Sequence, residues 1–273
     1  MELDMLVSKQ QYYSLYGQPN STPIRSKRKA VRNPRVRWTN GEIPYRFYPR
    51  HFSQRDQDMV RQAMTEWERY TCLRFRQATS SDTNVIVFLD AGGCYSWLGM
   101  MGGEQMISLS SPGCRNKETY LHEIGHAIGL VHEHQLPNRD DYVEILFENV
   151  DPNYWNQFTR YSSQAVDQMN VPYDYSSIMH YGANFFSKDG VSKTIRVKYP
   201  GKETIIGNAK KLSFTDVEIV NKMYKCPGGC RDEKDTCVTW ARYGFCNNNV
   251  DQAVRLCPKT CNLCHQRQGL LLR

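Results

Sequence analysis

The sequence predicts an α+β fold followed by a small cysteine-dense domain, and three observations support this. Strand-like runs come early in the folded part of the chain, whereas helical patterns dominate later. The length of 273 residues is enough for one substantial core with a small appendage, or for two modest domains. Six of the ten cysteines fall between Cys230 and Cys264, so the end of the chain differs in composition from the rest.

The first predicted elements lie between residues 37 and 90. The stretch RWTNGEIPYRFYP, which starts at Arg37, indicates a strand after a turn at Asn40-Gly41. Residues 54–75 carry apolar side chains at spacings of three and four, which predicts an amphipathic helix. The apolar, β-branched run at 84–90 should be a strand that is buried on both faces.

The later elements follow the same reasoning. Residues 102–111 predict another strand, and a histidine-rich helix comes after it. Residues 140–176 are rich in Asn, Asp, Tyr and Ser and should form mostly loops and short helices. The last helix is expected at 213–224, with Ser213 as its N-cap and Asp216 three positions on.

Bulk composition excludes two classes of partner. No apolar run approaches the roughly 20 residues that cross a bilayer, so no membrane span is expected. The formal net charge is +7, but the basic residues cluster between Arg25 and Arg37. No basic stripe with interleaved aromatic residues is present, so no nucleic acid is expected as a partner.

The cysteines favour disulfides over a zinc module. One C-x2-C pair occurs, Cys261 and Cys264, and only His265 lies beside it, so a zinc ribbon does not fit. A disulfide framework places the protein in an oxidising compartment, and we expect a secreted, extracellular protein. The N-terminal MELDMLVSKQQYY lacks the apolar region of a signal peptide, so we expect the sequence to be truncated there.

Four of the seven histidines lie in one stretch, YLHEIGHAIGLVHEH. His122 and His126 are four residues apart and therefore project from the same helix face, where they can bind one metal ion. Glu123 follows the first ligand, so its carboxylate can reach a water on the metal without being a ligand itself. A purely structural metal site would have no use for that carboxylate.

A catalytic zinc ion usually takes three protein ligands and leaves a position for water. Gly129 can end the helix in a left-handed conformation, so the chain can bring His132 round as the third ligand. His134 is expected to be only a loop side chain.

The string H-E-x-x-H-x-x-G-x-x-H is the signature of the metzincins, which also need a downstream Met-turn. SIMHY supplies that turn with Met179. With Glu133 directly after the third histidine and Tyr181 closing SIMHY, residues 30–226 resemble the astacin family of zinc metalloendopeptidases. The segments WTNGEIPYRF and GCYSWLGMMGGEQMISLSSPGC are also similar to astacin segments. Leu136 departs from the family, in which many members carry Arg, and this affects local loop packing.

The resemblance implies a two-lobed catalytic domain with a zinc cleft that hydrolyses peptide bonds. His122, His126 and His132 would bind one Zn²⁺ ion, and Glu123 would act as general base. The residue that matches Tyr181 is a further, displaceable zinc ligand that swings away to support the transition state. The residue that matches Glu133 reaches the new N-terminus of the processed enzyme through water.

The tail resembles a ShKT domain, with matching Trp240, Gly244 and C-x3-C-x2-C features. Nematode astacins often carry this combination. The place of the Lys-Tyr dyad of channel-blocking members is near Asp251 and Gln252, so a substrate-docking or matrix-binding role, for example on cuticle, is expected instead. The two resemblances imply five disulfides: Cys72–Cys226, Cys94–Cys114, Cys230–Cys264, Cys237–Cys257 and Cys246–Cys261.

The first residues are expected to be the end of a propeptide. They contain the only glycosylation sequon, at Asn20, and the basic string Arg25-Ser26-Lys27-Arg28, which is either a convertase site or a solvated charge run. Cleavage after Arg28 or Lys29 would start the mature chain at Lys29 or Ala30. Asp4 in MELDM is preferred as the zinc-blocking residue of the family's F-x-G-D motif, although Met1 and Leu3 replace its Phe and Gly. LYGQ keeps the Gly but lacks the carboxylate.

The expected division is a propeptide remnant at 1–28, a protease domain at 29–226, a ShKT domain at 230–264 and a tail at 265–273. Two functions compete: a secreted endopeptidase made as a latent zymogen, and a latent binding protein that acts through its ShKT domain. Lys210 and Lys211 lie where a basic side chain could read acidic residues after the cut. Many members have Gln-Arg where this chain has Asn208-Ala209, so the cleavage preference stays open.

Overall fold

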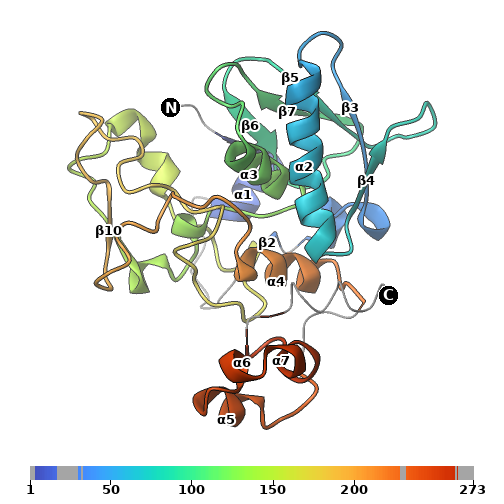
Figure 1. The fold of residues 1–273 in the computed structure, drawn as a ribbon. Coiled ribbons are helices and arrows are strands. Elements are labelled where there is room, and N and C mark those ends of the chain that lie inside the picture. The colour runs from blue at the N-terminus through green and yellow to red at the C-terminus, as the bar shows by residue number, and fades with distance from the viewer. Residues whose placement is uncertain (1–3, 17–29, 32, 228–231, 262, 264–273) are drawn as a thin grey trace.

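A six-stranded sheet forms the first half of the fold. The computed structural model describes residues 4–16, 30–31, 33–227, 232–261 and 263. The strands lie in the order β1-β6-β7-β5-β3-β4, and all neighbours are parallel except β6 and β7 (Figure 1). Their bounds are β1 Met5–Leu6, β3 Glu42–Phe47, β4 Arg74–Gln77, β5 Val85–Leu89, β6 Cys94–Trp97 and β7 Glu104–Leu109.

Two helices cover one face of this sheet, in front of it in Figure 1. Helix α2, Gln54–Tyr70, begins where the Ser53 side chain accepts a hydrogen bond from the Asp56 amide, and it buries an apolar stripe that includes Trp67. Helix α3, Lys117–Ala127, carries the histidine motif. We call residues 42–127 the sheet lobe.

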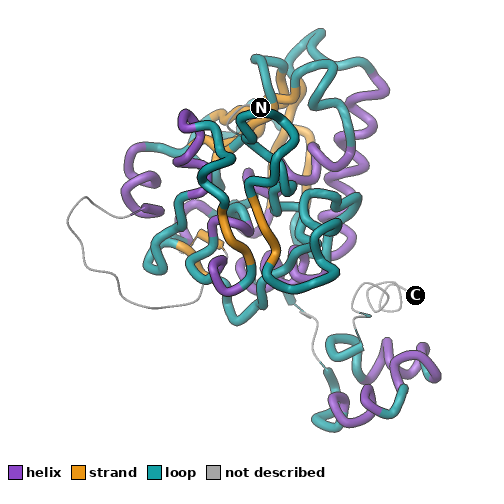
Figure 2. The backbone as a smooth tube through the Cα atoms, turned by 90° about the vertical axis from the view of Figure 1, so that its left-hand side faces the viewer, coloured by secondary structure: helices purple, strands orange, loops and turns teal. Residues whose placement is uncertain are grey.

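The rest of the protease region is mostly loop, as expected for residues 140–176, and Figure 2 shows it largely in teal. It contains the 3-10 turns η3 Glu133–Gln135, η4 Arg139–Asp141 and η5 Pro152–Phe158, and the antiparallel pair β8 Val143–Ile145 with β10 Ile195–Val197. A second hydrophobic cluster fills it, with Phe158, Tyr181 and Phe186 among its members. We call residues 130–211 the loop lobe. Leu136, the departure from the family pattern, is fully buried in this cluster.

The other elements complete the two lobes. Turns η1 Pro34–Val36 and η2 Thr39–Gly41 precede β3, and β2 Ala30–Val31 pairs antiparallel with β9 Val166–Asp167. Helix α4, Phe214–Met223, packs its buried face into the core of the sheet lobe. The tail contains α5 Cys237–Arg242, α6 Phe245–Asn248 and α7 Val250–Leu256.

Most of the predicted elements are confirmed, with two kinds of error. The strands expected after the turn at Asn40-Gly41, at 84–90 and at 102–111 are β3, β5 and β7, and α4 has the expected capping box of Ser213 and Asp216. The helix expected over 54–75 ends earlier, at Tyr70, and strand β4 follows it. The short strands β1, β2, β6, β8, β9 and β10 were not predicted.

The N-terminal segment lies against both lobes. Strand β1 pairs in parallel with β6, and α1, Lys9–Tyr16, follows it. Leu15 of α1 is 2% exposed, and its carbonyl accepts a hydrogen bond from the Ser162 amide of the loop lobe. The side-chain amide of Gln11 donates to the Leu98 carbonyl at 2.8 Å.

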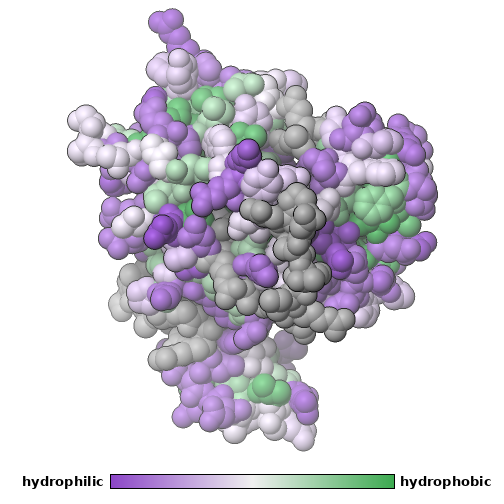
Figure 3. Space-filling model, turned by 180° about the vertical axis from the view of Figure 1, so that it is seen from behind, coloured by the Kyte–Doolittle hydropathy of each residue, from purple (hydrophilic) through white to green (hydrophobic). Residues whose placement is uncertain are grey.

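Four disulfides occur among the described residues, and each joins two cysteines that the resemblances pair: Cys72–Cys226, Cys94–Cys114, Cys237–Cys257 and Cys246–Cys261. The expected pair Cys230–Cys264 lies outside the described residues. Within the described part, no helix is both long and apolar enough to cross a membrane. The described surface seen in Figure 3 is mostly hydrophilic, with apolar side chains in small separate groups.

Candidate metal centre and active site

Helix α3 and the turn after it bring three histidines together. The helix begins at Asn116, whose side chain accepts a hydrogen bond from the Thr119 amide, and it presents His122 and His126 one turn apart. The chain then reverses at Gly129, which has a φ of +106° that only glycine adopts easily. This reversal places His132 opposite the helix, with its Nε2 atom 3.1 Å from the Nε2 atom of His126.

The hydrogen bonds of the three rings fix which nitrogen faces the site. Each Nδ1 lies within 2.9 Å of a carbonyl-type oxygen and therefore donates its proton there: His122 to Ile178 O, His126 to Leu130 O, and His132 to Gln135 Oε1. The three Nε2 atoms are consequently the lone-pair atoms, and they converge. This is the arrangement of metal-binding histidines, whose second nitrogen is held by an outer acceptor. Burial also lowers the pKa of His126 well below its usual value, which favours the neutral form that binds metal.

Asp4 of the N-terminal segment completes the group. Its Oδ2 atom lies 3.1 Å from His122 Nε2 and 3.0 Å from His132 Nε2, and its Oδ1 accepts a hydrogen bond of 3.1 Å from the Tyr181 hydroxyl. One ligand atom from each of Asp4 and the three histidines lies within 4.8 Å of the others.

Glu123 lies beside these ligands but is not one of them. The side chain is 1% exposed, and its Oε2 atom has no hydrogen-bond partner among the described residues. Burial, and then the charge of Asp4, raise the pKa of Glu123 well above its usual value. A buried carboxylate oxygen without a protein partner is costly, and such groups are typical of sites that act on a ligand.

A cavity of about 680 Å³ opens between the two lobes beside the histidines. It is lined by Glu123 and His122, by Ile178, Tyr181 and Phe185 of the loop lobe, and by the wall from Ser110 to Cys114.

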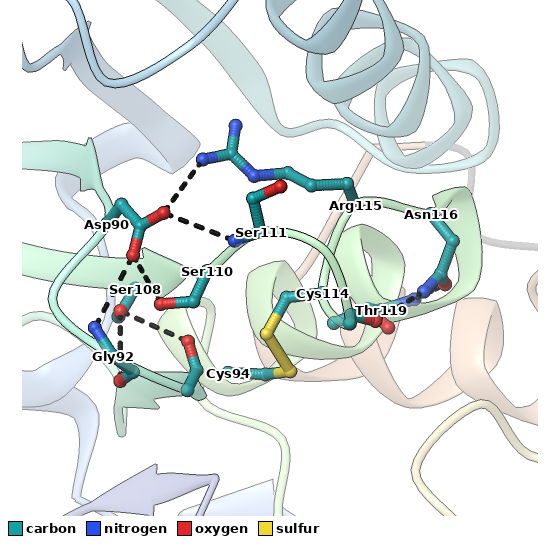
Figure 4. Close-up of a disulfide and its surroundings, with 12 residues drawn as sticks. Asp90, Gly92, Cys94, Ser108, Ser110, Ser111, Cys114, Arg115, Asn116 and Thr119 are labelled. Carbon is teal, nitrogen blue, oxygen red and sulfur yellow. Dashed lines mark hydrogen bonds and ion pairs between the residues drawn. A yellow bond between two sulfur atoms is a disulfide. The ribbon is translucent and has the colours of Figure 1, made fainter.

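Hydrogen bonds to Asp90 and a disulfide anchor the segment from Ser110 to Cys114 (Figure 4). Asp90 accepts hydrogen bonds from the Ser111 amide at 3.1 Å and from Arg115 at 3.3 Å, while the Cys94–Cys114 disulfide ties the wall to β6.

The expected Met-turn lies below the metal ligands. A Cβ added at Gly125 of α3 would come 2.7 Å from the Met179 sulfur, so the helix and the turn are in close contact. The Met179 carbonyl accepts a hydrogen bond from the Glu133 amide, and the Glu133 side chain accepts one of 2.6 Å from the Asp174 amide.

Two residues that hold the site in place were not predicted. Asp216, expected only as a capping residue, is 3% exposed and accepts hydrogen bonds from Ser177 Oγ at 2.6 Å and from the Ile178 amide at 3.0 Å. Because Ile178 O accepts the His122 proton, Asp216 supports a metal ligand from two steps away. Gln135 accepts hydrogen bonds from His132 and from the Tyr161 hydroxyl. The contact of Gln135 with His132 could have been found from their spacing of three residues in the sequence. Asp216 and Ser177 are far apart in the sequence, so no local pattern indicated their contact.

His134 lies outside the group of candidate metal ligands, as expected, but it is not a loop side chain. Its side chain is fully buried in the loop lobe, in η3, and its ring stacks on the ring of Tyr181 with centroids 4.0 Å apart. The expectation of a loop side chain failed because η5 and the Met-turn, which bury it, are distant in sequence. Of the other expected site residues, Asn20 and Arg25 to Arg28 lie outside the described residues.

Comparison with known proteins identifies the family. Residues 30–225 match the family described as Astacin, a family of peptidases, and residues 229–264 match the family described as ShK domain-like. Among solved structures, the hatching enzyme zinc-protease HCE-1 of Oryzias latipes is similar, with 34% identity, a TM-score of 0.64, and coverage of 70% of this chain and 93% of that one.

Curated relatives extend beyond the matched part. Zinc metalloproteinase nas-38 of Caenorhabditis elegans is 34% identical over 90% of this chain and 32% of its own length. Blastula protease 10 of Paracentrotus lividus is 36% identical over 88% of this chain and 43% of its own length. The chain thus spans less than half the length of these two relatives. On the family match over residues 30–225, the chain belongs to the astacin family of zinc metallopeptidases, and it carries an ShK-like domain at residues 229–264.

Proposed function

We propose that this chain is a secreted zinc-dependent endopeptidase that is made as a latent zymogen. The observation that supports it most strongly is the convergence of three histidine Nε2 atoms beside a Glu123 carboxylate oxygen that no described residue hydrogen-bonds. A cavity of about 680 Å³, lined by Glu123 and His122, opens at the same place.

The donors fit the metal of the family. Three neutral imidazoles with fixed tautomers are a donor set that suits catalytic zinc, and His122, His126 and His132 would hold the ion. When bound there, zinc acts as a Lewis acid that polarises the scissile carbonyl and lowers the pKa of a coordinated water to about 7.

Glu123 and Tyr181 carry out the remaining steps. Glu123 removes a proton from the attacking water and then delivers it to the departing amine. The Tyr181 hydroxyl donates a hydrogen bond to the oxyanion that develops on the scissile carbonyl. Its bond to Asp4 Oδ1 supports this role, because a carboxylate oxygen resembles an oxyanion in charge and acceptor geometry. A role of Tyr181 as a further, displaceable metal ligand is part of the same proposal.

The N-terminal segment would keep the enzyme latent. Asp4 lies among the metal ligands, while β1 and α1 pack on both lobes and hold it there. Cleavage at Arg25 to Arg28 would remove residues 1–28 and free the cleft. Glu133 would then reach the new N-terminus through water. The protease domain would occupy residues 29–226, the ShKT domain 230–264 and a tail 265–273.

The disulfides support export to an oxidising compartment. Protein or peptide substrates are expected. The ShKT domain would dock the enzyme on substrate or matrix, and Asn20 of the prosegment would carry a glycan.

The test measures zinc content and casein hydrolysis of the secreted chain after removal of the prosegment, with and without a chelator. We expect one zinc ion per chain, activity that the chelator abolishes, and a Glu123→Gln variant that keeps zinc but loses hydrolysis. Glu148→Gln, an exposed glutamate of the loop lobe, is the matched control and should keep activity. Zinc-free chain, or turnover by Glu123→Gln, would refute the mechanism, and sequencing of the mature N-terminus would test the cleavage site.

A further inference from the structure

His134 takes no part in the proposed mechanism, although it lies two residues from a metal ligand and is fully buried. Its ring lies nearly parallel to that of Tyr181, with an interplanar angle of 25° and a centroid distance of 4.0 Å. Three further described rings, those of His132, Phe185 and Phe186, have centroids 4.6 Å to 5.7 Å from that of Tyr181, and their planes are tilted by 46° or more. The ring of Phe158 is farther away, at 6.4 Å, and nearly perpendicular. His134 is therefore the described ring that faces Tyr181 flat.

The plane of the His134 ring is itself fixed. Its Nε2 donates a hydrogen bond of 2.9 Å to the Gln157 carbonyl at the end of η5. Arg139 donates to the carbonyls of His134 and Phe158 at 2.9 Å and 2.8 Å, so η3, which carries the ring, is tied to η5. The buried Nδ1 atom of His134 has no hydrogen-bond partner among the described residues, so one hydrogen bond and the stack set the ring orientation.

The ring orientation of Tyr181 determines where its hydroxyl lies. That hydroxyl points at the Asp4 carboxylate, 3.1 Å away, in the place where the proposed mechanism needs an oxyanion. Hydrogen bonds weaken steeply when the donor angle departs from linear, so a tilt of the Tyr181 ring would cost transition-state stabilisation. Substrate binding through the rest of the cavity would be unaffected by such a tilt.

We propose that His134 is a positioning residue for Tyr181: when the Tyr181 hydroxyl occupies the position seen here, turned to Asp4 Oδ1, the stacked His134 ring sets the plane of the Tyr181 ring so that the hydroxyl is aimed at the developing oxyanion. The inference rests on the proposed role of Tyr181. It assigns a function to a side chain that would otherwise only pack in the core of the loop lobe. Two effects can then be separated: loss of the ring stack should lower kcat, whereas loss of core packing alone should lower the free energy of unfolding.

The test is a double-mutant cycle on the chain after prosegment removal, with kcat and KM measured on a fluorogenic peptide and zinc content measured for each variant. Tyr181→Phe should lower kcat about 100-fold, because it removes one oxyanion donor. His134→Ala should lower kcat about 10-fold, with KM within about twofold and one zinc ion retained. In the Tyr181→Phe background, the same substitution should change kcat by less than about twofold, because no hydroxyl remains to be placed.

Two further variants separate positioning from packing. His134→Phe keeps a flat ring and should retain most of kcat. Val143→Ala, at a fully buried position of the same hydrophobic cluster, should lower the melting temperature and leave kcat unchanged. If His134→Ala does not accumulate, His134→Gln, which keeps a donor but no ring, replaces it in the cycle.

The outcomes distinguish the inference from the proposed function. An equal loss from His134→Ala in both backgrounds, a His134→Phe variant as poor as the Ala variant, or an unchanged kcat in His134→Ala would overturn the positioning role alone. An unchanged kcat in Tyr181→Phe would overturn the role of Tyr181 in the proposed function, and the inference with it.

Discussion

Replacement of Asp216 by Ala tests whether helix α4 supports the metal site. The carboxylate accepts three hydrogen bonds, from Ser177 Oγ at 2.6 Å, from the Ile178 amide at 3.0 Å and from the Ser213 amide at 2.9 Å. The Ala variant leaves two buried donors, at Ser177 and Ile178, without an acceptor.

Each unpaired buried donor costs about 1–3 kcal/mol. Burial raises the pKa of Asp216, so removal of a poorly solvated carboxylate returns part of that cost. We expect a net loss of about 2–4 kcal/mol in the free energy of unfolding, which for a domain of this size lowers the melting temperature by about 5–15 °C.

The same variant should also weaken zinc binding. The Ile178 carbonyl holds the Nδ1 proton of His122, and the loss of the bond at the Ile178 amide lets that segment move. Loss of such outer support typically costs 10- to 100-fold in metal affinity, which competition with a chelator measures.

Asp189 provides a matched control, because its carboxylate accepts four hydrogen bonds but lies on an exposed turn. Water can replace those bonds, so Asp189→Ala should have a much smaller effect on unfolding and none on zinc affinity. An Asp216→Ala variant that unfolds like the wild type, or one that loses stability but binds zinc normally, would refute the reasoning.

Two further predictions concern the N-terminal segment and pH. Asp4→Asn replaces the carboxylate that lies against His122 and His132 by an amide, which is a weaker metal ligand, so the uncleaved chain should gain casein hydrolysis; an uncleaved variant as inactive as the wild type would contradict the role of Asp4 in latency. Burial would raise the pKa of Asp174, but hydrogen bonds from Ser176 and Thr215 outweigh it and lower the pKa. The stability that Asp174 contributes is therefore present above the unfolded pKa of about 3.9 and is lost as the pH falls through the lower folded value. Denaturant unfolding should show Asp174→Asn less stable than the wild type at pH 7, with a smaller difference at pH 3, and an equal difference at both would refute this assignment.

The long, strongly patterned elements could be predicted from the sequence. Helix α2 has an apolar stripe along 17 residues, and β5 is a continuous apolar run, so each shows its burial locally. Strands β1, β8 and β10 have two or three residues each and exist only because a distant partner offers hydrogen bonds. No periodicity can develop over such lengths, and these strands were missed.

The site follows the same division. The spacing of His122, His126 and His132 is a local property of one helix and one turn, and it indicated the metal centre directly. The burial of His134 and the contact of Asp216 with Ser177 depend on how the loop lobe folds back on α3, which no sequence pattern records. The residues that carry the chemistry were therefore found, while those that orient them were not.

The Cys72–Cys226 disulfide closes a loop of 154 residues that contains both walls of the cleft and all three histidines. A nick made anywhere in that loop by another protease, or by a second copy of the enzyme, would give two fragments that stay linked by sulfur. Such a nicked molecule would migrate as one band on a gel without thiol and as two bands after reduction. Internal cleavage of this chain would therefore have to be followed under reducing conditions.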